Sequence, residues 1–142
     1  MRVDEVVKRT LAQHEIALKQ RGFVIETALA GAEVRTDPDA LAQVLANLRS
    51  NVEKYAHMGA YLSIETSKNE IRVRDKGPGV PQRDRERIFT PYVRLDDSLT
   101  EGASGTGIGL GIARDLARRM GGDLVCTEAD GGGALFIVTV GS

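Results

Sequence analysis

A glycine-rich run near the C-terminus of the chain reads Gly105-Thr106-Gly107-Ile108-Gly109-Leu110-Gly111. Apolar residues then recur at fourfold spacing, which predicts a helix from Thr106 to Met120. A glycine loop that turns into a helix leaves backbone N–H groups open at the helix N-terminus, and this geometry binds phosphate. The run is not a P-loop, which needs Gly-Lys-Ser/Thr after four variable residues. A flexible linker is the alternative, and the immediate start of a regular helix argues against it.

A second glycine motif, Asp75-Lys76-Gly77-Pro78-Gly79, follows an expected hairpin. Residues 61–66 alternate in the manner of a strand, 67–70 form a turn, and 71–75 return as the second strand. A carboxylate at this strand end can accept a hydrogen bond from an exocyclic amino group such as that of adenine. The neighbouring glycines let a flat base approach the backbone. The alternative is a hairpin-exit turn with a surface aspartate.

A long helix is expected over about five turns after the start signal Thr36-Asp37-Pro38. Its apolar residues have helical spacing, at Leu41, Val44, Leu45, Leu48, Val52 and Tyr55. Beside this stripe, Asn47, Asn51 and Lys54 lie at i, i+4 and i+7 and share one face. An asparagine carbonyl is a hard ligand suited to Mg²⁺, and Lys54 can offer charge to phosphates. A solvated polar face is the alternative.

Three such motifs in this order within one short chain predict a nucleotide site with a metal position, and ATP is the expected ligand. Residues 76–105 show little periodicity beyond a short helix near 83–89, and a long irregular segment of this kind is often a lid. Phe89 and Tyr92 could pack at the base of the lid, or they are core aromatics. Arg94 could reach a phosphate, or it is a surface arginine.

The rest of the chain supplies further elements of an α/β protein. A helix is expected over residues 4–19, strands over 23–27 and 33–35 around a turn at Gly31, and final strands over 123–127 and 134–140. A chain of 142 residues fits one domain, residues 1–142.

Bulk composition excludes several classes of protein. The formal net charge is −1, from 19 basic and 20 acidic residues, so nothing suggests attraction to nucleic acid or to a membrane. No apolar run approaches about 20 residues, and the N-terminus is too polar for a signal peptide. The single cysteine, Cys126, fits a reducing compartment and is expected to be a buried structural thiol.

These motifs resemble those of the ATP-binding catalytic domain of bacterial sensor histidine kinases, within the gyrase, chaperone, kinase and MutL (GHKL) superfamily. The similarity extends from about Val3 to Val140. Residues 47–55 look like the asparagine box of the family, 75–80 like its first glycine box, 87–92 like its phenylalanine box and 105–110 like its second glycine box. Arg49, Val52, Lys76 and Leu135 depart from the commonest pattern, but none of them removes a proposed ligand.

The resemblance implies a role for each matched residue. Asn51 would be the main Mg²⁺ ligand with Asn47 assisting, and with Lys54 these residues would form the catalytic set. Asp75 would take the adenine amino group, and the second glycine box would hinge and cap the lid over the triphosphate. The implied nucleotide-binding residues are Asn51, Lys54, Tyr55, Asp75, Gly77, Gly79, Val80, Arg94, Gly105, Thr106, Gly107, Ile108, Gly109 and Leu110.

The implied fold is a two-layer α/β sandwich of the Bergerat type. It has a mixed, mostly antiparallel sheet with helices on one face and a flexible ATP lid. The implied activity is transfer of the γ-phosphate of Mg-ATP to a histidine on a separate dimerisation domain, and then to an aspartate of a response regulator. That phosphoacceptor domain is not expected within this chain, because His14-Glu15-Ile16 only echoes the start of its motif. A cytoplasmic location is expected, with no direct membrane contact.

Three other functions remain open from the sequence. Hydrolysing ATPases of the superfamily carry a glutamate at the first position of the asparagine box, where Asn47 cannot act as a base, so hydrolysis should be slow. A stand-alone anti-sigma-type protein-serine kinase would also be short. A non-enzymatic nucleotide-binding pseudokinase would keep the same boxes.

Overall fold

Five strands form one mixed sheet in the order β1-β2-β3-β5-β4. They are β1 (Val24–Ala28), β2 (Tyr61–Ser67), β3 (Glu70–Asp75), β4 (Asp123–Glu128) and β5 (Ala134–Thr139). β1 pairs with β2 in parallel, and the other three pairings are antiparallel. The expectation of a mixed, mostly antiparallel sheet is confirmed.

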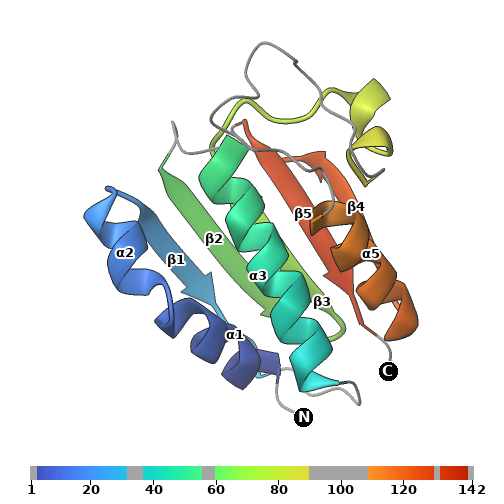
Figure 1. The fold of residues 1–142 in the computed structure, drawn as a ribbon, viewed down its shortest axis with the longest axis horizontal. Helices are drawn as coiled ribbons and strands as arrows, with labels where there is room; N and C mark the ends of the chain where they lie inside the picture. The colour runs from blue at the N-terminus through green and yellow to red at the C-terminus, as the bar shows by residue number, and fades with distance from the viewer. Residues whose placement is uncertain (1–2, 32–36, 56–59, 90–108, 130–131, 141–142) are drawn as a thin grey trace.

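The computed structural model describes residues 3–31, 37–55, 60–89, 109–129 and 132–140. Its helices lie on one face of the sheet (Figure 1), as the two-layer prediction requires. The helical elements are α1 (Val3–Ala12), α2 (Glu15–Gln20), α3 (Pro38–Tyr55), α5 (Gly109–Arg119) and the 3-10 helices η1 (Gln82–Asp84) and η2 (Arg87–Phe89). The strand expected at 33–35 lies outside the described residues.

The long central helix α3 begins where its sequence predicts. The side chain of Asp37 accepts a hydrogen bond from the backbone N–H of Asp39 at 2.9 Å, which satisfies one of the donors left open at a helix start. The apolar stripe is buried against the sheet, and Leu41, Val44 and Leu48 have no exposed surface. This face of α3 is therefore the centre of the core, and its neighbouring polar face is fixed in place with it.

Arg49 lies at a position where the family that the chain resembles more often has an apolar residue. In the structure, an ion pair stabilises the arginine there. Its guanidinium pairs with Glu53 one turn along α3, and Glu53 also accepts a hydrogen bond from Arg21 at 3.0 Å. Only 14% of the Arg49 side chain is exposed, and its aliphatic stem packs while one terminal nitrogen of its head is paired with Glu53. Its Nε is buried and makes no hydrogen bond to a described residue.

The N-terminal helix differs from the expectation of one helix over residues 4–19. It is divided at His14, whose backbone leaves the helical region at φ −128° and ψ −4°. α1 packs on α3, whereas α2 packs beside β1 at the edge of the sheet. The break redirects the chain from the helix layer to that edge, and both Leu11 and Leu18 remain buried.

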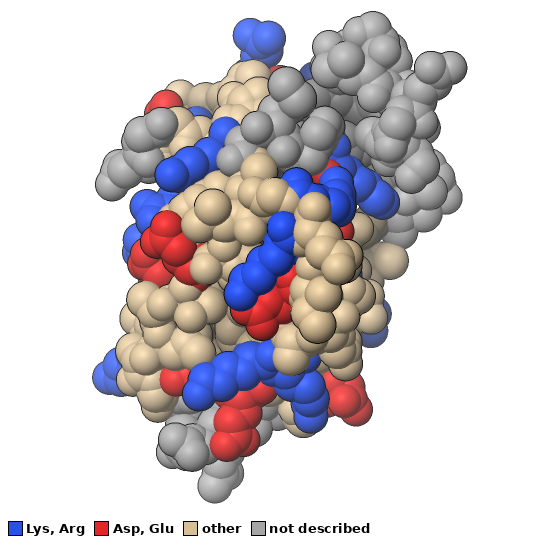
Figure 2. Space-filling view, turned by 90° about the vertical axis from the view of Figure 1, so that its left-hand side faces the viewer, with Lys and Arg blue, Asp and Glu red and all other residues tan. Residues whose placement is uncertain are grey.

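Charged side chains of both signs are interspersed on the side of the molecule shown in Figure 2. Several of them are paired, for example Lys19 with Glu15 at 3.0 Å. Among the helices that the structure describes, none combines the length and the apolar character needed to cross a bilayer.

Candidate functional site

The sequence motifs meet at one end of the sandwich. The last turn of α3, the end of β3 and the beginning of β5 lie at the upper end of Figure 1, and α5 begins beside the middle of α3. The 3-10 helices η1 and η2 lie at the same end, beside α5. The later turns of α3, the end of β3 and the start of α5 thus place Asn51, Asp75 and Gly109 in the upper half of the fold, from three separate elements.

Asp75 is the most buried charged residue of this end, with 4% of its surface exposed. Its Oδ1 accepts two backbone hydrogen bonds, from Gly77 at 2.9 Å and from Ala134 at 3.0 Å. Its Oδ2 makes no hydrogen bond to any residue that the structure describes. A buried carboxylate costs free energy unless its oxygens are paired, so Oδ2 is a candidate acceptor for a ligand.

Two glycines shape the backbone around this carboxylate. Gly133 has φ +93°, and a Cβ added there would lie 2.2 Å from the main-chain oxygen of Asp75. Gly79 has φ +76°, and a Cβ there would lie 3.3 Å from the main-chain oxygen of Gly133. The glycine motif after β3 and the turn before β5 therefore approach each other closely, and only glycine fits at Gly133.

Asn47 is held by hydrogen bonds at both ends of its amide. Nδ2 donates to the main-chain oxygen of Gly109 at 3.0 Å, and Oδ1 accepts from Nε2 of Gln43 at 2.8 Å. The first of these bonds joins α3 to the first residue of α5. Asn47 is thus in contact with Gly109 of the glycine-rich run.

Asn51 lies one turn further along α3 and is half-buried. Its amide makes no hydrogen bond to a described residue, which leaves its oxygen open to a ligand. Lys54 is exposed at the end of the same face and has an interaction partner. Among the described residues, no cluster of three or more His, Cys, Asp or Glu side chains could hold a metal ion. A metal here would rest on the amide oxygen of Asn51 and on ligand oxygens.

Several predicted site residues lie outside the described part of the chain. They are Tyr92, Arg94, Gly105, Thr106, Gly107 and Ile108, together with the side chain of Tyr55. Val80 and Leu110 are described, and both are partly buried against the core. The helix expected from Thr106 is described from Gly109 to Arg119, and the short helix expected near 83–89 consists of the two 3-10 turns. Phe89 is buried in the core.

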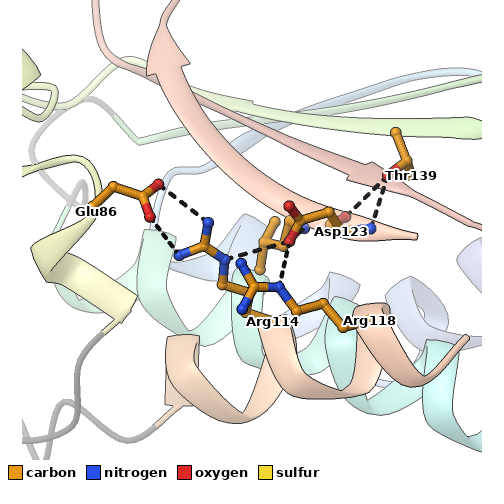
Figure 3. Close-up of polar contacts among 6 residues, drawn as sticks. Glu86, Arg114, Arg118, Asp123 and Thr139 are labelled. Atoms are coloured by element: carbon orange, nitrogen blue, oxygen red, sulfur yellow. Dashed lines mark hydrogen bonds and ion pairs between the residues drawn. The ribbon is translucent and has the colours of Figure 1, made fainter. Parts of the chain in front are cut away.

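The sequence analysis missed the role of Arg114 on α5 (Figure 3). Its guanidinium donates to both carboxylate oxygens of Glu86, at 3.0 and 3.1 Å, and its Nε donates to Asp123 at 3.3 Å. Its Cζ also lies 4.6 Å from the centre of the Phe89 ring. Arginine occurs at many surface positions, so its residue type gives no signal. Its place one turn into the helix that follows the glycine run is the only sequence feature that could have drawn attention to it.

The charges of this cluster stabilise one another. Hydrogen bonding to Glu86 raises the pKa of Arg114 above its ordinary value, against the effect of burial. Burial alone would raise the pKa of Asp123, but the backbone N–H of Leu124 and the guanidinium groups of Arg118 and Arg114 lower it below its ordinary value. An open surface pocket of about 320 Å³ is lined in part by Arg114 and Phe89, and Asp75 does not line it.

Cys126 lies on β4 with its thiol buried, as predicted. Burial raises its pKa from 9.0 to about 11, while the charge of Arg85 lowers the pKa and that of Asp75 raises it. The thiol is therefore neutral and unreactive in the folded protein at ordinary pH.

The family model, the curated relatives and the solved structures that this chain matches all include histidine kinases. Residues 36–141 match the family described as histidine kinase-, DNA gyrase B-, and HSP90-like ATPase. The sensor histidine kinase WalK of Bacillus subtilis (strain 168) is 34% identical over 113 residues, which are 75% of this chain and 18% of WalK. The chain spans less than a third of the length of the first curated relatives that it matches.

Solved structures agree with the sequence matches. The mycobacterial sensor histidine kinase MprB superposes with a TM-score of 0.79 at 22% identity, covering 99% of this chain and 94% of that one. Full-length ShkA in complex with AMPPNP superposes with a TM-score of 0.78 at 25% identity, covering 100% of this chain and 31% of that one.

Proposed function

The chain belongs to the family of histidine kinase-, DNA gyrase B- and HSP90-like ATPases, and we propose that it binds Mg-ATP and donates the γ-phosphoryl group to a histidine. Within that family it is a domain of the sensor histidine kinase type, like WalK. The location of its nucleotide site, its acceptor and its metal are parts of the proposal.

The observation that carries the proposal is the half-satisfied carboxylate of Asp75. Its Oδ1 is held by Gly77 and Ala134, so Oδ2 has a fixed direction and no described partner. An acceptor of this kind on a largely buried residue fits the exocyclic amino group of adenine, which donates. Gly79 and Gly133 let the motif after β3 and the turn before β5 pack backbone against backbone next to Asp75. The AMPPNP named with ShkA is an adenine nucleotide, which supports the same ligand class.

The phosphates would lie between α3 and α5. Lys54 would contribute charge, and the first turn of α5 with the glycine run before it would offer backbone N–H groups. Mg²⁺ suits the donor set, because Asn51 presents an open amide oxygen and the phosphates supply the other hard oxygen ligands. When bound, the ion would neutralise charge on the transferring phosphoryl group.

In the proposed reaction, a ring nitrogen of an acceptor histidine attacks the γ-phosphorus. The bond from phosphorus to the β–γ bridging oxygen breaks, and that oxygen keeps the electron pair in ADP. A nitrogen–phosphorus bond forms, and the imidazolium product releases its N–H proton to solvent. The chain contributes to this transfer by positioning the reactants and by neutralising charge. Asn47 has no carboxylate that could take a proton from water and so activate it for hydrolysis. Hydrolysis in the absence of an acceptor should therefore be well below about one turnover per second.

The acceptor would lie on a separate helical domain, and the phosphoryl group would pass on to an aspartate of a response regulator. The name of WalK, a sensor histidine kinase, supports histidine rather than serine as the acceptor. A cytoplasmic location completes the proposal, since a free thiol such as Cys126 persists in a reducing compartment.

Calorimetric titration with a non-hydrolysable ATP analogue, with and without Mg²⁺, tests the proposal. The sharpest variant is Asp75→Asn, whose carbonyl oxygen can keep both backbone hydrogen bonds while its NH₂ faces the adenine amino group as a second donor. Binding of the ATP analogue should be lost. An inosine triphosphate analogue, which presents an accepting oxygen in place of that amino group, should bind the variant better than the ATP analogue does. Unchanged ATP binding by the variant would refute the adenine site.

A further inference from the structure

Arg114 joins its own helix to the next strand and to a segment 28 residues earlier in the sequence. It lies on α5, its guanidinium forms a two-pronged contact with Glu86 between η1 and η2, and its Nε bonds to Asp123 at the start of β4. The guanidinium also stacks over Phe89, the last residue of η2, with 4.6 Å from Cζ to the ring centre. Only 12% of the Arg114 side chain is exposed, whereas the side chain of its partner Glu86 is 76% exposed, so the contact is buried on the Arg114 side and open to water on the Glu86 side.

This geometry is specific to arginine. A planar guanidinium can donate two parallel hydrogen bonds to one carboxylate, a third to another and stack on a ring at the same time, which an ammonium group cannot do. The neighbouring Arg118 offers a comparison on the same helix. It is 54% exposed, and it makes one hydrogen bond, to Asp123 at 3.0 Å. Exposed single pairs of that kind contribute little.

The position of the contact relates it to the site. Glu86 and Phe89 stand just before the segment 90–108, and Gly109 stands just after it. Arg114 therefore holds η2, which precedes that segment, against α5, which follows it (Figure 3). Gly109 is in turn bonded to Asn47 of α3. α5 is thus held from two sides, by α3 at Gly109 in its first turn and by η2 at Arg114 in its second turn.

We propose that Arg114 is a positioning residue of the nucleotide site, which acts through Glu86 and Phe89 to fix the first turn of α5 against the phosphates. The inference rests on the proposed function. It assigns Arg114 to the phosphate end of the site alone, because the adenine end has separate anchors: Asp75 is held by Gly77 and Ala134, which Arg114 does not touch.

The test compares two ligands in the same protein. The variants are Arg114→Lys, Glu86→Gln and the double variant, with Arg118→Ala as the matched control. Affinity for a non-hydrolysable ATP analogue with Mg²⁺ is measured by calorimetry, and affinity for adenosine by ligand-observed NMR. Arg114→Lys and Glu86→Gln should each weaken binding of the ATP analogue about tenfold and change adenosine binding less than twofold. The double variant should bind the ATP analogue with the same affinity as the single variant that binds it less tightly. Arg118→Ala should bind both ligands as the parent does.

Each other outcome overturns a specific statement. Equal losses for the ATP analogue and adenosine would mean that Arg114 only supports the fold. Unchanged ATP-analogue binding by both single variants would overturn the inference while the proposed function stands. A parent chain that binds no ATP analogue would overturn the proposed function and the inference with it. Glu86 is 76% exposed, so Glu86→Gln tests the contact even if Arg114→Lys does not fold.

Discussion

Asn47 donates a hydrogen bond from its side-chain amide to the main-chain oxygen of Gly109, at 3.0 Å. These residues are 62 positions apart in the chain, and the bond joins the middle of α3 to the first residue of α5. The oxygen of the same amide is occupied by Gln43 at 2.8 Å. Asn47 therefore has a structural contact in addition to the phosphate-side role that the resemblance implies, and the two roles can be separated by experiment.

Asn47→Ala should lower the free energy of unfolding by about 1 kcal/mol, because the Gly109 oxygen loses a partly buried partner. It should also weaken binding of an ATP analogue by a similar factor with and without Mg²⁺, since the bond to Gly109 involves no metal. Gln43→Ala is the control, as it removes only an exposed bond to the same amide. A loss confined to the Mg²⁺-containing titration would instead indicate that Asn47 acts as a metal ligand.

Asn51→Ala should show the opposite pattern. Its amide makes no hydrogen bond to a described residue, so the free energy of unfolding should change by less than about 0.5 kcal/mol. Binding of the ATP analogue in EDTA should match the parent, and the gain in affinity on adding Mg²⁺ should be reduced at least tenfold. Paired titrations of parent and variant across Mg²⁺ concentrations measure this gain. A variant with the full Mg²⁺ response would place the metal elsewhere.

Gly133→Ala should be among the most damaging small substitutions at this end of the fold. The new Cβ would lie 2.2 Å from the main-chain oxygen of Asp75, in addition to the strain of φ +93°. We expect a loss of more than about 2 kcal/mol in the free energy of unfolding, measured by urea denaturation. Gly132→Ala is the matched control, because Gly132 has φ +102° and a Cβ there would meet nothing within 4 Å. Similar losses in both variants would mean that backbone strain alone explains the effect.

Cys126 should make stability depend on pH in the alkaline range. Its pKa is about 11 in the folded protein and near 9.0 when exposed, so the unfolded chain loses this proton first as the pH rises. The folded state should therefore lose up to about 3 kcal/mol from this group between pH 9 and 11, with its contribution fully present below pH 9. Urea denaturation at pH 8 and pH 10.5 measures this loss, and Cys126→Ala should show a smaller decrease than the parent. Equal decreases would show that other groups cause the alkaline destabilisation.

Much of the fold could be predicted because its signals are local. The apolar spacing from Leu41 to Val52 determines which face of α3 is buried, and the Asp37-Pro38 start marks its first turn. The hairpin of β2 and β3 follows from alternation and a short turn, which also places Asp75 at a strand end. These predictions required only neighbours within a few residues.

The missing parts of the site depend on pairings between distant segments. Ala134 meets Asp75 because β5 adds to β3, and nothing near residue 134 indicates that pairing. Gly133 could be interpreted only as part of a turn until its distance to Asp75 was known. Arg114 and Glu86 are likewise 28 residues apart, on elements whose contact depends on the packing of η2 against α5. The prediction of one continuous N-terminal helix was wrong because α1 and α2 pack against different elements of the fold.

The contacts that fix both ends of residues 90–108 have a consequence for evolution and for engineering. Phe89 is held by the core and by Arg114, and Gly109 is held by Asn47, so both residues that border this interval are anchored to the folded body. Between two anchored ends, each doubling of the number of connecting residues costs only about 0.6 kcal/mol of closure entropy. Insertions or grafted peptides between Phe89 and the glycine run that begins at Gly105 should therefore leave the folded body intact, which makes this interval the natural place for homologous chains to diverge in length.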